Sequence, residues 1–236
     1  MTTLGLKRLE HGSLSQRAVE ALLDHILTKD LKPGTTLPAV ATLATSLGVS
    51  RPVVRESLNA LRALGIVEIA NGKKAVIRDL NNGVLSVYFG RALQVVDDSV
   101  REVMDVRVGI ETRAAALAAR NRSDADVAVL RGTLIEMKET LGDASAFSLH
   151  DSTFHLAIAE ASGNRLIFHI VESLQSSLRN ASYQGVRAIS ERASLNRIID
   201  EHTLLVEAIE GRQQDRAADL MRDHLANAMK RMGISA

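Results

Sequence analysis

Residues 49–58 read Val49-Ser50-Arg51-Pro52-Val53-Val54-Arg55-Glu56-Ser57-Leu58, and this segment decides the fold of the N-terminal part of the chain. Serine commonly caps helices and proline fits a first helical turn, so Ser50 and Pro52 predict that a helix begins here. Val54, Leu58 and Leu61 follow at the spacing of one helix face, and we expect this face to be buried.

Another face of this predicted helix is cationic. It carries Arg51, Arg55, Asn59 and Arg62 at helical spacing. A cation near a helix N-terminus costs about 0.3–1 kcal/mol, and like charges four residues apart add a few tenths of a kcal/mol. A polyanion against this face would reverse both penalties, whereas a merely solvated face leaves them unexplained. The pattern therefore predicts a helix that reads DNA.

Two further helices are expected before this one, over residues 15–29 and 38–46. Leu47-Gly48-Val49 forms the turn between the second helix and the cationic helix, which extends to about Leu64. A short turn containing glycine between two helices is the helix-turn-helix signature.

A β-hairpin is expected after the cationic helix. Residues 66–70 and 73–77 are the two candidate strands, and Asn71-Gly72 between them is a preferred two-residue turn. Its tip carries Gly72, Lys73 and Lys74. Glycine at such a tip lets the backbone approach a phosphate or the minor groove closely, so the hairpin is predicted to be a DNA-binding wing.

The composition supports a folded protein with two dissimilar parts. The chain has 236 residues, no cysteine and a net charge of +1. Residues 1–78 contain 11 Lys and Arg against 6 Asp and Glu, whereas residues 79–236 contain 18 against 22. We therefore expect the basic part to meet nucleic acid. No apolar run is long enough to span a membrane and no secretory signal is evident, so a cytoplasmic location is expected.

Residues 81–236 show helical periodicity throughout and almost no strand signal. The expected helices lie at about 83–95, 99–120, 123–141, 144–161, 164–184, 190–210 and 213–231. Because aromatic residues are few, we predict an all-α bundle of six or seven helices packed mainly by alanine and branched aliphatic side chains. A mainly α protein with a winged helix-turn-helix domain at 1–80 and this bundle at 81–236 follows.

Four candidate metal ligands fall on three of these helices. They are Asp151, His155, His202 and His224, and each histidine shares a helix face with apolar residues. One carboxylate and three imidazoles form a set that Zn²⁺ and similar metals accept. Spacing alone leaves open that each histidine is a hydrogen-bonded core residue and that Asp151 and His155 form a surface ion pair.

The N-terminal motifs resemble the GntR family of bacterial transcription regulators. The match covers about residues 15–78 and rests on Leu37-Pro38, Leu43-Ala44, Leu47-Gly48-Val49-Ser50-Arg51, Val54-Arg55-Glu56-Ser57-Leu58, Leu61 and Gly65. The resemblance implies that Arg51, Pro52, Arg55 and Gly72 contact operator DNA. Residues 39–42, Ala-Val-Ala-Thr, replace the acidic residue and DNA-contacting arginine that the family usually has here. The operator preference is therefore expected to differ.

The C-terminal motifs resemble the FCD effector domain of the FadR-type branch of that family. They are Asp151-Ser152-Thr153-Phe154-His155, Gly163-Asn164, Glu201-His202, Ala208-Ile209-Glu210-Gly211-Arg212 and Met221-Arg222-Asp223-His224-Leu225. The resemblance implies that Asp151, His155, His202 and His224 bind a divalent metal, with zinc expected and nickel or manganese as alternatives.

Arg107 and Glu111 match an Arg-x-x-x-Glu element of the same branch. The resemblance implies that Arg107 faces the cavity and binds a carboxylate of the effector, for which a guanidinium is suited. An ion pair between Arg107 and Glu111 is the alternative interpretation. Asn180 is a weaker candidate for the same cavity.

These features predict a homodimeric transcription repressor that responds to a small organic acid. Two winged helices would read two half-sites of double-stranded operator DNA, and residues 79–85 would form a junction that permits reorientation. A metal-dependent hydrolase or lyase is an alternative, although no motif supplies a general base. An architectural DNA-binding protein with a structural metal is another.

Overall fold

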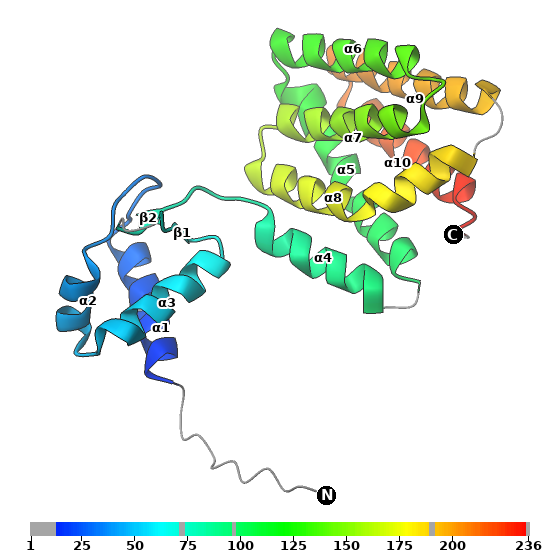
Figure 1. The fold of residues 1–236 in the computed structure, drawn as a ribbon. Coiled ribbons are helices and arrows are strands. Elements are labelled where there is room, and N and C mark those ends of the chain that lie inside the picture. Colours follow the sequence, from blue (N-terminus) through cyan, green and yellow to red (C-terminus); the bar gives the residue numbers. More distant parts are fainter. Residues whose placement is uncertain (1–12, 71–73, 96–97, 189–191, 235–236) are drawn as a thin grey trace, which may run out of the picture. The chain divides into compact units, whose positions relative to one another are not determined.

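The computed structural model describes residues 13–70, 74–95, 98–188 and 192–234, without the side chains of residues 177, 179–188 and 192–194. The chain divides into two compact units, Met1–Val84 and Leu85–Ala236, which Figure 1 shows in blue to cyan and in green to red. The division falls near the expected boundary at residue 80, and each unit is described by itself.

The first unit contains three helices and two short strands. They are α1 (Leu14–Thr28), α2 (Val40–Leu47), α3 (Arg51–Ala63), β1 (Val67–Glu68) and β2 (Val76–Ile77). The strands are antiparallel, with Val67 opposite Ile77. Both are shorter than the sequence pattern predicts. The turn residues 71–73, which include Gly72 and Lys73 of the predicted wing, lie outside the described residues.

Residues 34–37 add to this hairpin, a pairing that the local sequence pattern does not predict. Thr36 forms a bridge with Val76, and the Leu37 N–H donates to the Ala75 carbonyl at 2.8 Å. Leu37 is thereby buried in the core that lies between the helices and the hairpin. The hairpin is thus extended on its β2 side by the segment that leads into α2.

Helix α3 is held by its apolar face, as predicted. Val54, Leu58 and Leu61 are buried, and the buried Ser57 hydroxyl lies 2.9 Å from both the Ser15 and the Val53 carbonyl oxygens. Ser50 does precede the helix, but its side chain makes no capping hydrogen bond, contrary to the expectation from its residue type. The predicted start of α3 after Ser50 is therefore confirmed, but the predicted capping by the Ser50 side chain is wrong.

The second unit consists of seven helices within its described residues. They are α4 (Gly83–Val95), α5 (Ser99–Asn121), α6 (Asp124–Glu139), α7 (Ala144–Ala161), α8 (Arg165–Ala188), α9 (Arg192–Glu210) and α10 (Gln214–Arg231). Their bounds lie close to those predicted, and those of α4 and α7 coincide with them. In this part of the chain, no helix is long and apolar enough to cross a membrane.

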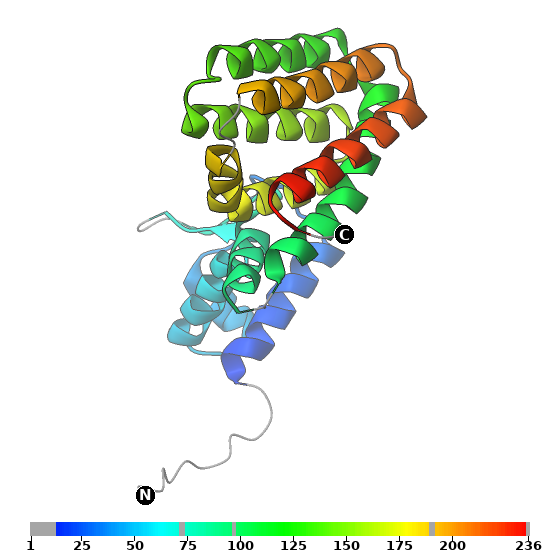
Figure 2. The same ribbon diagram turned by 90° about the vertical axis from the view of Figure 1, so that its right-hand side faces the viewer.

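Helix α5 contacts four other helices of the bundle; it passes behind α7 and α8 in Figure 1 and runs along one edge of the bundle, beside α10, in Figure 2. It packs against α7, α8, α9 and α10. Alanine is the most frequent residue among its buried side chains, with Ala114, Ala115, Ala118 and Ala119 almost fully covered. These small side chains let several helices approach α5 closely, so side chains from different helices can meet beside it.

The predicted junction at 79–85 is only partly irregular, because α4 already begins at Gly83. Asn81 makes two hydrogen bonds here: its amide Nδ2 donates to the Gly65 carbonyl at 3.2 Å, and its Oδ1 accepts from the Gly83 N–H at 3.0 Å. The junction is therefore tied at Asn81 to Gly65, two residues beyond the end of α3 in the first unit.

The start of α6 offers a test of helix capping. Ser123 and Asp126 form a reciprocal capping box, with the Ser123 N–H donating to Asp126 at 2.8 Å. Ser123→Ala is expected to lower the free energy of unfolding by about 1 kcal/mol, measured by urea denaturation. Ser145→Ala, at an exposed position inside α7, is the control and should change stability by less than about 0.5 kcal/mol. Equal effects would contradict the capping role.

Candidate metal centre and nucleic-acid interface

The residues of the predicted cationic face lie on the exposed side of α3. Arg51, Arg55, Asn59 and Arg62 are exposed, and Pro52 is exposed in the first turn. Among the described residues, neither Arg51 nor Arg55 has a carboxylate at ion-pair distance. Both charges are therefore available to an external anion.

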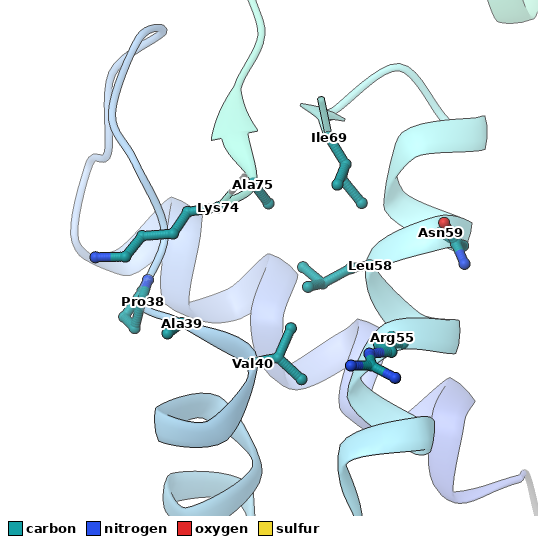
Figure 3. A pocket seen from close by; sticks show the side chains of 9 residues that line it. All are labelled: Pro38, Ala39, Val40, Arg55, Leu58, Asn59, Ile69, Lys74 and Ala75. Atoms are coloured by element: carbon teal, nitrogen blue, oxygen red, sulfur yellow. The ribbon is translucent and has the colours of Figure 1, made fainter. Parts of the chain in front are cut away.

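Arg55 borders a surface hollow of about 480 Å³ between α3, the start of α2 and the hairpin (Figure 3). The hollow is lined by Pro38, Ala39, Val40, Arg55, Leu58, Asn59, Ile69, Lys74 and Ala75. It has two cationic side chains and an otherwise mostly apolar lining, with no acidic residue. The wall formed by Ala39 and Val40 is where the sequence departs from the GntR pattern, so this face offers methyl groups in place of a charged side chain.

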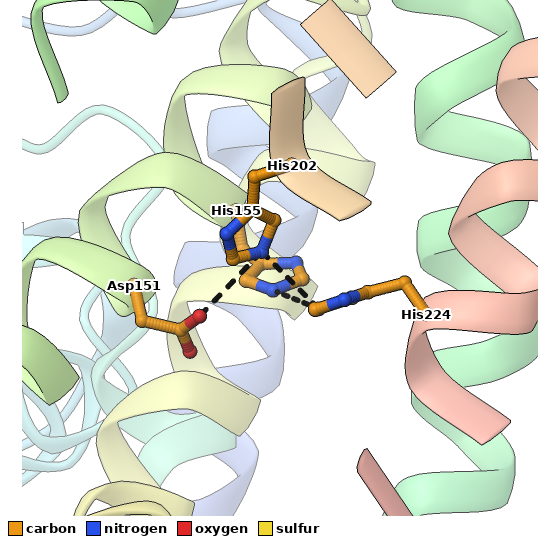
Figure 4. Close-up of side chains that lie close together, drawn as sticks. All are labelled: Asp151, His155, His202 and His224. Atoms are coloured by element: carbon orange, nitrogen blue, oxygen red, sulfur yellow. Dashed lines mark hydrogen bonds and ion pairs between the residues drawn. The ribbon is translucent and has the colours of Figure 1, made fainter. Parts of the chain in front are cut away.

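The second unit brings together the four candidate metal ligands (Figure 4). Asp151 and His155 come from α7, His202 from α9 and His224 from α10. One ligand atom from each lies within 4.8 Å of all the others. The three histidines are buried and Asp151 is partly exposed, so the cluster is closed on the histidine side.

The distances between the ligand atoms suit a metal ion. His224 Nε2 lies 3.2 Å from His202 Nε2 and 3.3 Å from His155 Nε2. His202 Nε2 lies 3.5 Å from Asp151 Oδ1. Tetrahedral ligands with metal bonds of 2.0–2.1 Å are about 3.3 Å apart. The side chains therefore have the spacing that one coordinated cation requires.

The tautomers that the neighbours favour also fit a cation. His224 Nδ1 lies 2.7 Å from Glu201 Oε2, and His155 Nδ1 lies 2.6 Å from Glu111 Oε2. A carboxylate beside Nδ1 favours the proton on that atom, which leaves Nε2 with a bare lone pair. Two such nitrogens facing each other at 3.3 Å repel unless a cation lies between them. The residues present thus fit a divalent metal.

Burial keeps the ligands in the form that binds metals. It lowers the pKa of His202 well below its ordinary value, and the neighbouring His224 and His155 lower it further. Burial also lowers the pKa of His224, although Glu201 opposes this shift. Both imidazoles are therefore neutral near pH 7.

The two carboxylates behind the histidines are ionised. Burial raises the pKa of Glu111, but the Arg107 guanidinium and His155 outweigh burial and hold it far below its usual range. Burial likewise raises the pKa of Glu201, and His224 and Arg231 reverse that effect. Each carboxylate can therefore accept a hydrogen bond at neutral pH.

Arg107, a predicted effector-binding residue, is buried beside this cluster. Its Nε lies 2.6 Å from Glu111 Oε1 and its Nη2 lies 3.5 Å from Glu111 Oε2. The Arg107–Glu111 ion pair, the alternative interpretation, is thus present, and the effector role of Arg107 stays a prediction. The side chain of Asn180, the other candidate, lies outside the described residues.

Two residues of this site were not recognised as such from the sequence. Glu201 contacts His224 from 23 positions away, and Glu111 was considered only as a partner of Arg107. The i, i+4 spacing of Arg107 and Glu111 was a local signal for their pair, whereas no local spacing relates Glu201 to His224. His150 and His169 lie apart from the site, beside Glu136 and Glu172.

Comparison with known proteins identifies the two units. The family model described as bacterial regulatory proteins, gntR family, matches residues 14–77, and the FCD domain model matches residues 102–227. Together they cover the winged helix and most of the helical bundle.

Three curated relatives are similar over most of their length. The HTH-type transcriptional regulator LutR of Bacillus subtilis is 34% identical over 84% of this chain and 91% of its own. The transcriptional repressor NanR of Salmonella schwarzengrund is 30% identical over 95% and 88%. The Glc operon transcriptional activator of Escherichia coli is 28% identical over 94% and 90%. All three are transcription regulators.

A solved structure supports the fold. Streptococcus agalactiae GntR superposes with a TM-score of 0.66 at 23% identity, over 92% of this chain and 99% of that one. At this identity the likeness shows the architecture alone, a helix-turn-helix domain followed by a helical domain.

Proposed function

The chain belongs to the GntR family of bacterial regulatory proteins and carries an FCD domain, and we propose that it is a repressor whose operator affinity is set by a small carboxylate bound beside a divalent metal. Membership of the family makes it a DNA-binding transcription regulator that responds to a small molecule, and not an enzyme. The metal, the carboxylate and the direction of control are our proposal.

The convergence of Asp151, His155, His202 and His224 is the observation that carries the proposal. Three imidazoles and one carboxylate favour zinc, with nickel or manganese as alternatives. Bound there, such an ion supplies a positive charge that attracts an anionic effector. Asp151 is the only partly exposed member of the set, so we place the entry of the effector on its side.

Arg107 and Asn180 are our candidates for further contacts to the effector. Arg107 is held 2.6 Å from Glu111, so an effector carboxylate would have to share its guanidinium with that residue. An arginine has five N–H donors and can serve two carboxylates. The proposal therefore does not require the Arg107–Glu111 pair to break.

A homodimer would present two copies of α3 to two operator half-sites. Arg51, Pro52, Arg55, Gly72 and Lys73 are the residues that we assign to this contact. Binding of the effector would favour one arrangement of the two DNA-binding units. The junction at 79–85 joins each DNA-binding unit to its helical bundle, so it would transmit this change. Because binding free energies are coupled, DNA would alter the affinity for the effector by the same factor.

The response to carboxylates is the test of this proposal. A duplex selected from a random library by the metal-loaded protein serves as the operator, and its affinity is measured by fluorescence anisotropy with a panel of small mono-, di- and hydroxycarboxylates. At least one acid is expected to weaken operator binding by about 5- to 150-fold. The corresponding amides, which lack the charge, are the matched controls and should have no effect.

Two results would contradict the proposal. If no acid in the panel changes operator affinity, the protein is better described as an architectural DNA-binding protein whose metal is structural. If an acid strengthens binding, the expected direction of the effect is wrong while the carboxylate site stands.

A further inference from the structure

Two of the three candidate histidine ligands are backed by a carboxylate on the side away from the cluster. Glu201 Oε2 lies 2.7 Å from His224 Nδ1 with hydrogen-bond geometry. Glu111 Oε2 lies 2.6 Å from His155 Nδ1, although out of line with the ring N–H bond. The pairs approach from different helices, α9 to α10 and α5 to α7.

Each of these carboxylates is in turn held by an arginine. Arg107 contacts Glu111 at 2.6 Å, and Arg231 Nη1 lies 3.3 Å from Glu201 Oε1. Asn227 also donates to Glu201 Oε1, at 2.9 Å. The carboxylates therefore cannot rotate away from the histidines without losing a second partner.

His202 differs from the other two histidines. Its Nδ1 is buried and has no hydrogen-bond partner among the described residues. The ring instead packs against Phe154, with 4.4 Å between the ring centroids. Among the described residues no carboxylate lies behind His202 Nδ1, so the cluster has two histidines that are backed by a carboxylate and one that is not.

We propose that Glu201 and Glu111 are positioning residues that orient His224 and His155 toward the metal. This inference depends on the proposed metal site. The carboxylate keeps the proton on Nδ1, so that Nε2 presents its lone pair, and its negative charge makes that nitrogen a stronger donor. Glu201 is expected to contribute more to metal affinity than Glu111, because only the contact of Glu201 with its histidine has hydrogen-bond geometry.

The test compares metal affinity in the full-length protein. Zn²⁺ affinity is measured by competition with a chelating dye, and Co²⁺ binding by its visible absorption spectrum, which reports the ligand geometry. Glu201→Gln keeps the shape of the side chain but removes its charge. It is expected to weaken Zn²⁺ binding by about 10- to 100-fold and to shift the Co²⁺ spectrum.

Glu172→Gln is the matched control. Glu172 also lies beside a histidine, at 3.5 Å from His169 Nδ1, but that histidine is not part of the cluster. This variant should bind Zn²⁺ and Co²⁺ as the wild-type protein does. A loss of affinity in both variants would show a general effect of removing a charge and would overturn the inference.

Glu111→Gln is a second variant. If it fails to fold, the test still rests on Glu201→Gln. Glu111 is almost fully buried and its replacement leaves Arg107 without its charged partner, whereas Glu201 is partly exposed. Wild-type Zn²⁺ affinity and an unchanged Co²⁺ spectrum in Glu201→Gln would overturn the proposal and leave the metal site standing. Absence of metal binding by the wild-type protein would overturn the metal site itself.

Discussion

Arg55→Ala is expected to abolish sequence-specific operator binding while the protein stays folded. Arg55 is exposed on α3, lies at the hollow between α3 and the hairpin, and has no carboxylate at ion-pair distance in the described part of the chain. Its removal therefore leaves no buried group unpaired. A well-formed arginine contact to a base edge is worth about 1–3 kcal/mol, and a dimer loses it at two half-sites. The expected loss of affinity is thus roughly 30-fold to 10⁴-fold.

The measurement is fluorescence anisotropy with the selected duplex, together with a thermal melt of the free protein. Arg101→Ala is the matched control, since Arg101 is an exposed arginine of the helical unit that pairs with Asp98 at 3.5 Å. Its operator affinity should stay within about twofold of the wild type, because an exposed ion pair contributes little. Wild-type affinity in Arg55→Ala would remove the assignment of α3 as the recognition helix.

The helices of this protein could be predicted because their signals are local. The cationic and apolar faces of α3 follow from spacing within 13 residues, and the start of α6 is marked by Ser123 and Asp126. The hairpin was predicted less well. Residues 34–37 pair with β2 across about forty positions, and a strand this short has no alternation that periodicity can detect. The structure of residues 34–37 is therefore determined by long-range pairing and not by a local sequence pattern.

The candidate metal site likewise combines features that a local spacing predicts with features that depend on long-range packing. Asp151 and His155 are four residues apart on α7, so their common face was evident from the sequence. That His202 and His224 reach the same point depends on how α9 and α10 pack against the alanine face of α5, which spacing within one helix does not specify. Glu201 was missed for this reason, because its partner His224 lies on another helix.

Replacing His202 and His224 together by alanine is expected to remove the bound metal completely. Two of four ligands are lost, and the remaining Asp151 and His155 lie on one helix and cannot enclose an ion. A metal present at about 1,000 times its dissociation constant stabilises the folded state by about 4 kcal/mol. The rise in melting temperature on adding Zn²⁺ to the stripped wild-type protein should therefore be absent in the variant. Metal content per chain after dialysis is the direct measurement.

His150→Ala with His169→Ala is the matched double variant, since both histidines lie beside carboxylates outside the cluster. It should retain the metal and the zinc-dependent rise in melting temperature. Both alanine replacements at the cluster also leave space in a packed core, because His202 and His224 are almost fully buried. That loss of packing lowers stability in the presence and absence of zinc alike, so the difference between the two melts isolates the metal. Stoichiometric zinc in the cluster variant would show that the four side chains are not its ligands.

The same variant separates sensing from DNA binding. Its α3 surface lies in the other compact unit and keeps Arg51 and Arg55, so the operator should still be bound. If the carboxylate acts beside the metal, the acid that weakens operator binding by the wild-type protein should no longer do so in this variant. Continued response to the acid without bound metal would place the effector elsewhere, whereas loss of operator binding itself would mean that the metal is needed to hold the regulator in its DNA-binding form.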